Sequence, residues 1–147
     1  MKKCYNSLKT TSITSRLCRK KILNELDKLW SLYVRHRDNK CMLCGGYVGQ
    51  PEKLQAHHWI IARGKSLKYR FDPRNGIALC YGCHIHQVHT NPTVDIINRV
   101  RESALSNHIV TLDDIEEIVN SSRSVNKITT VELQEKLEDL KNLLTYR

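Results

Sequence analysis

The sequence contains no apolar run that approaches the roughly 18–20 residues needed to span a lipid bilayer. Its first residues are basic and rich in serine and threonine, and they lack the apolar h-region of a signal peptide. Apart from two short cysteine motifs there is no internal repeat, and there is no low-complexity tract. We therefore expect a cytoplasmic protein with no membrane partner, long enough for one ordinary domain with appended helices.

Acidic residues are scarce in the first 90 residues, where 17 lysines and arginines stand against 5 aspartates and glutamates. In the remaining residues the balance reverses, with 7 basic and 10 acidic side chains. Basic charge concentrated in one part of a chain predicts a polyanionic partner, most simply nucleic acid. A generally basic domain without such a partner is the alternative.

Two cysteine pairs with C-x-x-C spacing lie in the basic part of the chain. In a cytoplasmic protein such pairs bind metal or do redox work more often than they form disulfides. A thioredoxin-like site would need one pair within a βαβ pattern, whereas two pairs and many histidines favour zinc. We predict one structural Zn²⁺ held by Cys41, Cys44, Cys80 and Cys83.

Apolar spacing predicts one helix before the cysteine motifs. It runs from about Arg16 to Arg37, and one face carries an apolar stripe: Ile22, Leu26, Leu29, Trp30 and Tyr33. Residues 54–61 and 77–80 are typical of two short strands, because aromatic and β-branched residues gather there. The second motif leads into a helix that carries histidines and that Pro92 interrupts.

The tail is predicted to be helical. Thr111 precedes two aspartates, and Thr129 precedes Glu132 by three positions, both patterns of a helix N-terminus. A leucine stripe follows, which either packs within the chain or forms the seam of a homodimer: Leu133, Leu137, Leu140 and Leu144. The expected fold class is α+β, with a flexible basic arm (residues 1–15), a zinc-stabilised core with its leading helix (16–92) and a helical C-terminal extension (93–147).

Two segments resemble the HNH endonucleases, whose ββα-metal finger cleaves phosphodiester bonds. They are Gln55–Gly64, with the sequence QAHHWIIARG, and Asn75–His84, with the sequence NGIALCYGCH. A further segment, Leu29–Asp38 (LWSLYVRHRD), looks like the stretch before the first cysteine pair in phage NinG/Rap recombination endonucleases. The resemblance covers about residues 41–90. It implies a ββα-metal core and DNA cleavage in recombination or processing, in the host cell cytoplasm if the chain is phage-encoded.

The resemblance also assigns roles by position. His57 matches a metal-binding position, and His58 matches the general base. Asn75 matches the asparagine that orients this base, and His84 matches a second metal ligand. For His84 the alternative is a place in the zinc site, as the fourth ligand of a Cys₃His set.

The third ligand of the catalytic ion stays open. Many family members have another histidine or asparagine four positions after the second ligand, where this chain has Val88. His89 lies one position too late and His86 too early, so each is either a ligand, a phosphate contact or part of a solvated helix face.

The residue types suit phosphodiester hydrolysis. An imidazole with a pKa near 6.5 can accept a proton from water at neutral pH, and one divalent cation can stabilise the charge on the phosphate. Beside the structural zinc we expect a catalytic cation, Mg²⁺ or Mn²⁺ first, although imidazole ligands suit Mn²⁺, Ni²⁺ or Zn²⁺ at least as well. Adjacent residues of a regular strand point to opposite faces, so His57 and His58 share a site only if the strand ends, twists or bulges there.

Basic side chains near these motifs are candidates for contacts with DNA phosphates. They lie in the loop after the first strand and at the end of the leading helix: Arg63, Lys65, Lys68, Arg70, Arg35 and Arg37. The predicted function is a metal-dependent DNA endonuclease that uses a histidine general base and one metal ion. The alternative is a zinc-stabilised module that binds nucleic acid without cleaving it, which the charge and the cysteines would fit equally well.

Overall fold

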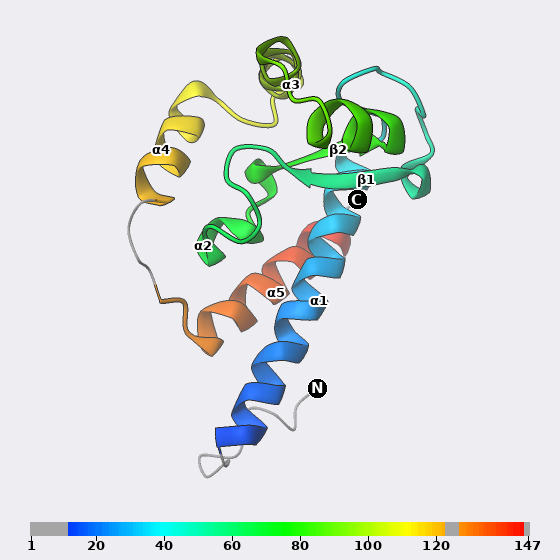
Figure 1. The fold of residues 1–147 in the computed structure, drawn as a ribbon. Coiled ribbons are helices and arrows are strands. Elements are labelled where there is room, and N and C mark those ends of the chain that lie inside the picture. Colours follow the sequence, from blue (N-terminus) through cyan, green and yellow to red (C-terminus); the bar gives the residue numbers. More distant parts are fainter. Residues whose placement is uncertain (1–11, 123–126, 146–147) are drawn as a thin grey trace.

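The computed structural model describes residues 12–122 and 127–145, with side chains from Arg16 onward. A long first helix leads into a two-stranded hairpin, and three more helices form the tail (Figure 1). The elements are α1 Ser12–Asp38, η2 Pro51–Lys53, β1 Leu54–His58, α2 Leu67–Arg70, η3 Pro73–Asn75, β2 Gly76–Cys80, η4 Gly82–His89, α3 Val94–Ser106, α4 Leu112–Ser122 and α5 Thr130–Thr145. The α+β class is confirmed at this level, as a mostly helical fold with a small antiparallel sheet beside four clustered cysteines.

Helix α1 packs against both strands of the sheet and against the tail helix α5. Its predicted stripe is buried or half-buried, and Leu26 and Val34 are fully enclosed. The helix begins at Ser12 rather than Arg16, so the last four residues of the expected arm are helical. Residues 1–11, which make up the rest of that arm, lie outside the described part of the chain.

The sheet is one antiparallel hairpin in which Leu54 pairs with Cys80 and His58 pairs with Gly76. All five residues of β2 are buried, because both of its edges are covered. One edge pairs with β1. On the other, the Ala78 N–H donates to Asp38 at 2.7 Å, and the Ala78 carbonyl accepts from the Met42 N–H at 2.8 Å. The first cysteine motif is therefore fastened to the strand that carries Cys80.

Gly76 marks the closest approach of the hairpin to α1. A Cβ built on this glycine would lie 2.6 Å from side-chain carbons of both Trp30 and Val34. Any larger residue would push β2 away from the helix, and overpacking of this kind typically costs about 1–3 kcal/mol. The glycine in the Asn-Gly pair is thus required by packing at the start of a strand.

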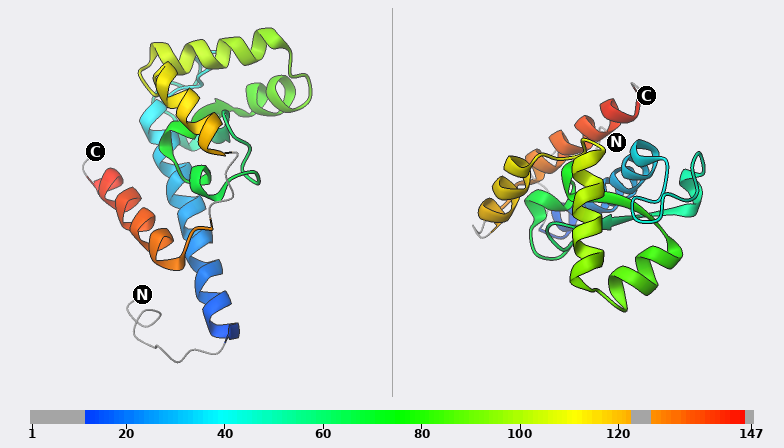
Figure 2. Two further views of the ribbon diagram at one scale, coloured as in Figure 1. Left: turned by 90° about the vertical axis from the view of Figure 1, so that its left-hand side faces the viewer. Right: turned by 90° about the horizontal axis from the view of Figure 1, so that it is seen from above.

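The tail helix α5 runs alongside α1, as Figures 1 and 2 both show. Leu133, Leu137 and Leu140 are at most 2% exposed and belong to the main hydrophobic core. The intramolecular alternative for the leucine stripe is confirmed for these three residues. A homodimer seam built on them is wrong, because α1 already covers them.

Both predicted N-terminal caps are present in the tail. The Thr111 hydroxyl accepts from the Asp114 N–H at 3.1 Å, and the Asp114 carboxylate accepts from the Thr111 N–H at 2.8 Å. Thr129 and Glu132 make the same reciprocal pair at the start of α5. Between residues 12 and 145, leaving aside the undescribed stretch 123–126, no helix is both long enough and apolar enough to cross a membrane.

Candidate metal centres and the histidine site

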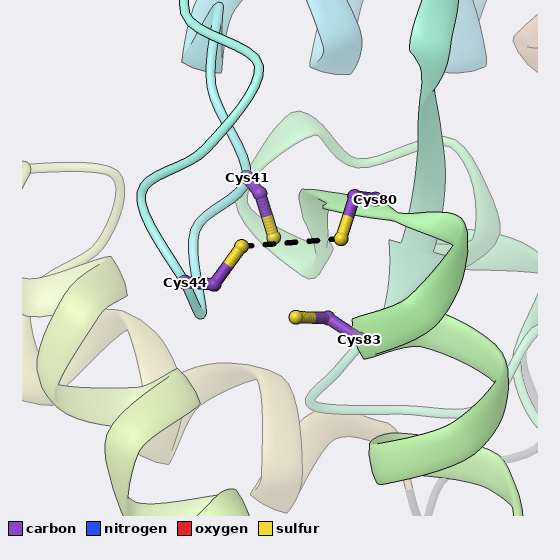
Figure 3. A group of neighbouring side chains, drawn as sticks. All are labelled: Cys41, Cys44, Cys80 and Cys83. Carbon is purple, nitrogen blue, oxygen red and sulfur yellow. Dashed lines mark hydrogen bonds between the residues drawn. The ribbon is translucent and has the colours of Figure 1, made fainter.

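The four cysteines of the two motifs point toward one common centre, two from the first motif, one from the end of β2 and one from η4 (Figure 3). Their Sγ atoms all lie within 4.8 Å of one another, and the Cys44 and Cys80 Sγ atoms are 3.9 Å apart. A disulfide would need about 2.05 Å. Four thiolates around zinc at about 2.3 Å would stand about 3.8 Å apart, so this cluster could hold a metal such as zinc.

The surroundings of the cluster favour the thiolate at Cys41, but they raise the pKa values of Cys44 and Cys83. Burial raises the pKa of Cys41, but N–H groups of Cys44, Cys80 and Leu43 outweigh it and bring that pKa to about 7. Burial and the neighbouring thiols raise the pKa of Cys83. Four neighbouring thiols cannot all ionise without a positive charge between them, which a divalent ion would provide.

A second group of possible metal ligands consists of His57 on β1 and His84 and His89 on η4. His84 Nε2 is 3.1 Å from His57 Nδ1 and 3.0 Å from His89 Nε2. Nitrogens around one ion at 2.0–2.1 Å would stand about 3.0–3.4 Å apart, so the three could act as a ligand set. The structure thus places His84 with the histidines and not in the cysteine cluster.

The π-helical form of η4 brings His89 into this group. A π-helix closes its hydrogen bonds between residues five apart, whereas an α-helix closes them four apart. His84 and His89 are five positions apart, so this wider turn puts them on one face. The exposed His86 points elsewhere and its ring packs edge-on against Tyr81. The π-helical spacing therefore brings His89, and not Val88, beside His84.

Gln55 orients His84, a contact that the sequence analysis did not predict. Its Oε1 accepts from His84 Nδ1–H at 2.6 Å, which leaves the His84 Nε2 lone pair facing the other two histidines. Side chains that hold the far nitrogen of a ligating histidine tune metal sites in the same way. Gln55 is two residues before His57 on β1, so the alternation of a strand placed both on one face.

The imidazoles of His57 and His84 favour the neutral form that metal binding requires. Burial and the nearby His84, His89 and His58 lower the pKa of His57 to about 3. Burial and His89 also lower the pKa of His84.

His58 lies on the opposite face of β1 from His57, at the end of the strand. Its ring stacks on Trp30 of α1, with centroids 4.0 Å apart and planes 15° apart. Its Nε2 donates to the Arg70 carbonyl at 2.8 Å, so the proton is on Nε2 and Nδ1 carries the lone pair. Burial lowers the pKa of His58, although the Arg70 carbonyl opposes the shift. His57 and His58 therefore point to opposite faces of β1, as the alternation of a regular strand predicts, and β1 ends at His58.

Asn75 is fully buried, and its amide is committed to the main chain that follows β1. Its Oδ1 accepts from the Ile60 and Ile61 N–H groups at 3.1 and 2.9 Å. Its Nδ2 donates to the Ile61 and Tyr69 carbonyls. The direct contact with an imidazole that we expected is absent from the described hydrogen bonds. Instead, the Asn75 side chain binds the N–H groups of Ile60 and Ile61 and the Ile61 carbonyl, which a longer strand would have paired with β2. Strand β1 therefore ends at His58, three residues earlier than predicted.

The basic side chains expected to meet phosphate fall into two sets. Arg37 is 12% exposed, and it donates to Asp38 and to the Pro73 and Gly76 carbonyls, so most of its guanidinium group is used within the chain. Arg35 and Arg70 also use part of their guanidinium groups within the chain. The other three are accessible to different degrees: Arg63 and Lys65 are exposed, and Lys68 is half-buried.

Comparison of the chain with models of known protein families, with curated proteins and with solved structures found no match.

Proposed function

We propose that this protein is a metal-dependent endonuclease that hydrolyses phosphodiester bonds of DNA. The observation that carries the proposal is the convergence of His57, His84 and His89, with the neighbouring His58 on the opposite face of β1 and fixed in one tautomer. The hairpin, the helix that follows and the flanking cysteines have the order expected of an HNH core. A zinc ion on the four cysteines would be structural, because this set leaves no ligand position open for substrate.

The three histidines would hold the second ion. Among the described residues the group contains only imidazole nitrogens, a donor set that suits Mn²⁺, Ni²⁺ or Zn²⁺ better than Mg²⁺. Such an ion, when bound, supplies positive charge that stabilises the phosphorane and the departing alkoxide. The preference among ions is therefore a chemical property of this site that a titration can test.

The chain's own residues would do the remaining work. His58 has its Nε2 proton held by the Arg70 carbonyl, so Nδ1 is the atom that can accept a proton from the attacking water. Arg63, with 60% of its side chain exposed, can donate to a phosphate oxygen beside this base. There is one such set per chain, so one chain makes one nick, and cutting both strands needs two chains or two successive nicks.

Replacing His84 by alanine should weaken the response to the added divalent ion without releasing zinc from the cysteines. Loss of one ligand lowers affinity for the ion, so cleavage should fall and higher Mn²⁺ should restore part of it. His86→Ala is the matched control, because this histidine is on the same helix but outside the group. Cleavage measured against Mn²⁺ concentration, with zinc counted by elemental analysis, decides the matter. Zinc loss in His84→Ala would instead make His84 a structural ligand.

The proposal is tested by incubating the protein with linear, nicked and branched DNA, with and without Mg²⁺, Mn²⁺ or Zn²⁺. We expect strand cleavage that needs an added ion and disappears in His57→Ala but survives in His36→Ala, whose side chain is exposed on α1. Binding without cleavage under every ion condition would favour the alternative of a zinc-stabilised nucleic-acid-binding module.

A further inference from the structure

We propose that Asp27 of α1 is a positioning residue for His58 and for the phosphate-binding Arg63. This inference rests on the proposed nuclease function for its kinetic consequences, although its structural consequence can be measured without any cleavage. Nothing in the motifs of the hairpin points to Asp27, which lies 31 positions before His58 in the chain.

Arg63 and Arg70 share one acidic partner among the described residues, and this partner is Asp27. Its Oδ1 accepts from Arg70 Nε at 3.0 Å, and its Oδ2 accepts from Arg70 Nη2, so the pair is bidentate. The same Oδ2 accepts from Arg63 Nη2 at 2.7 Å. About a fifth of the Asp27 and Arg70 side chains is exposed, so this pair is more shielded than an ordinary surface ion pair.

The Arg70 end of this network leads directly to His58. The bidentate pair with Asp27 fixes the short helix α2, and the Arg70 carbonyl then accepts from His58 Nε2. Trp30, one turn after Asp27 on α1, packs against the face of the same imidazole. Helix α1 therefore contacts the ring face of His58 through Trp30, and through the Asp27–Arg70 pair it supports the residue whose carbonyl accepts the Nε2 proton.

The Arg63 end of the network is open to solvent. Arg63 has a single contact to Asp27 and keeps its other donors exposed, so it can bind a phosphate oxygen without leaving the carboxylate. Since one carboxylate faces two guanidiniums, the three groups together keep a charge of +1 beside His58. Asp27 thus fixes the positions of the two guanidinium groups, and its carboxylate lowers their combined charge from +2 to +1.

This arrangement separates catalysis from binding. Asp27→Asn keeps the size of the side chain and removes its charge, so DNA should bind at least as tightly as to the wild type. The rate should nevertheless fall about 10–100-fold, the usual effect of losing an outer partner of a catalytic group. Arg70→Lys breaks the bidentate pair without changing the net charge and should slow cleavage by a similar factor. Glu25→Gln, the same change elsewhere on α1, is the matched control.

The experiment combines kinetics with nitrogen NMR of the histidine rings in the zinc-loaded full chain at pH 8, where free imidazole is neutral. We expect one His58 tautomer with the proton on Nε2 in the wild type and in Glu25→Gln. In Asp27→Asn and Arg70→Lys we expect a mixture of tautomers, with kcat reduced and KM not raised.

Retention of the single Nε2–H tautomer in a folded Asp27→Asn or Arg70→Lys protein would overturn the inference, as would a raised KM with unchanged kcat. If Asp27→Asn does not fold, Arg70→Lys decides the question alone. A wild-type protein that cleaves no DNA would refute the proposed function, while the tautomer measurement would still judge the role of Asp27.

Discussion

Replacing His58 by alanine should lower the rate of DNA cleavage by about 10²–10⁴-fold, the usual contribution of a general base. DNA affinity should stay nearly unchanged, because the exposed basic residues of α1 and of the loop after β1 remain. The measurement is single-turnover cleavage with the variant in excess over DNA, together with a binding titration at the same salt concentration.

Two controls separate loss of the base from loss of the fold. His58 stacks on Trp30, so alanine also leaves a gap against α1, and thermal melting must accompany the kinetics. His58→Gln fills most of that space without supplying a base and should be equally slow. A folded His58→Ala protein that cuts at the wild-type rate would contradict the assignment, and His57 would then be the next candidate.

Replacing Cys80 by serine should release zinc and abolish cooperative melting of the segment between the two cysteine motifs. Apparent binding free energies of structural zinc sites in small peptides are about 10–16 kcal/mol at neutral pH, and this energy is then folding energy. Cys80 ends β2, so its loss would free the strand that pairs with the two histidines of β1.

The readouts for Cys80→Ser are elemental analysis and circular dichroism during heating. Cys18→Ser is the matched control, because Cys18 is half-buried on α1 and outside the cysteine cluster. Pure wild-type protein that contains no zinc, with these four cysteines paired as disulfides, would show that the assignment is wrong.

The parts of the fold that follow from local patterns were predictable. The C-x-x-C spacing placed four thiols around one centre, and the two threonine caps located the starts of α4 and α5. The stripe on α1 likewise identified its buried face. The caps, the stripe and each cysteine pair depend on residues that are close together in the sequence, whereas the meeting of the two pairs spans the 36 positions between Cys44 and Cys80.

The parts that depend on distant contacts were not predictable. No local sequence pattern predicts that η4 is π-helical, so the sequence alone did not show whether His89 lies beside His84. Asn75 was expected at an imidazole, but its amide binds the main chain of Ile60, Ile61 and Tyr69. We expected Arg37 to contact phosphate. The carbonyls that it binds, at Pro73 and Gly76, are almost 40 positions away in the sequence, so no local pattern indicates these contacts.

The site around His58 illustrates the same limit. The alternation of a strand predicted that His57 and His58 would face opposite ways, and they do. The groups that hold His58 are Trp30, on α1 before the first cysteine motif, and the Arg70 carbonyl, on α2 between β1 and β2. Their meeting is a consequence of how α1 crosses the sheet, which depends on the close contact at Gly76.

We propose that the histidine group holds an exchangeable ion needed for cleavage, while a separate ion on the cysteines maintains the fold. The most direct test is the rate of nicking of supercoiled DNA by protein dialysed against a chelator until one zinc per chain remains. We expect a folded protein that does not nick DNA until Mn²⁺ is added, and that regains full activity at saturation. Undiminished nicking by the dialysed protein, or no nicking at any concentration of any divalent ion, would contradict it.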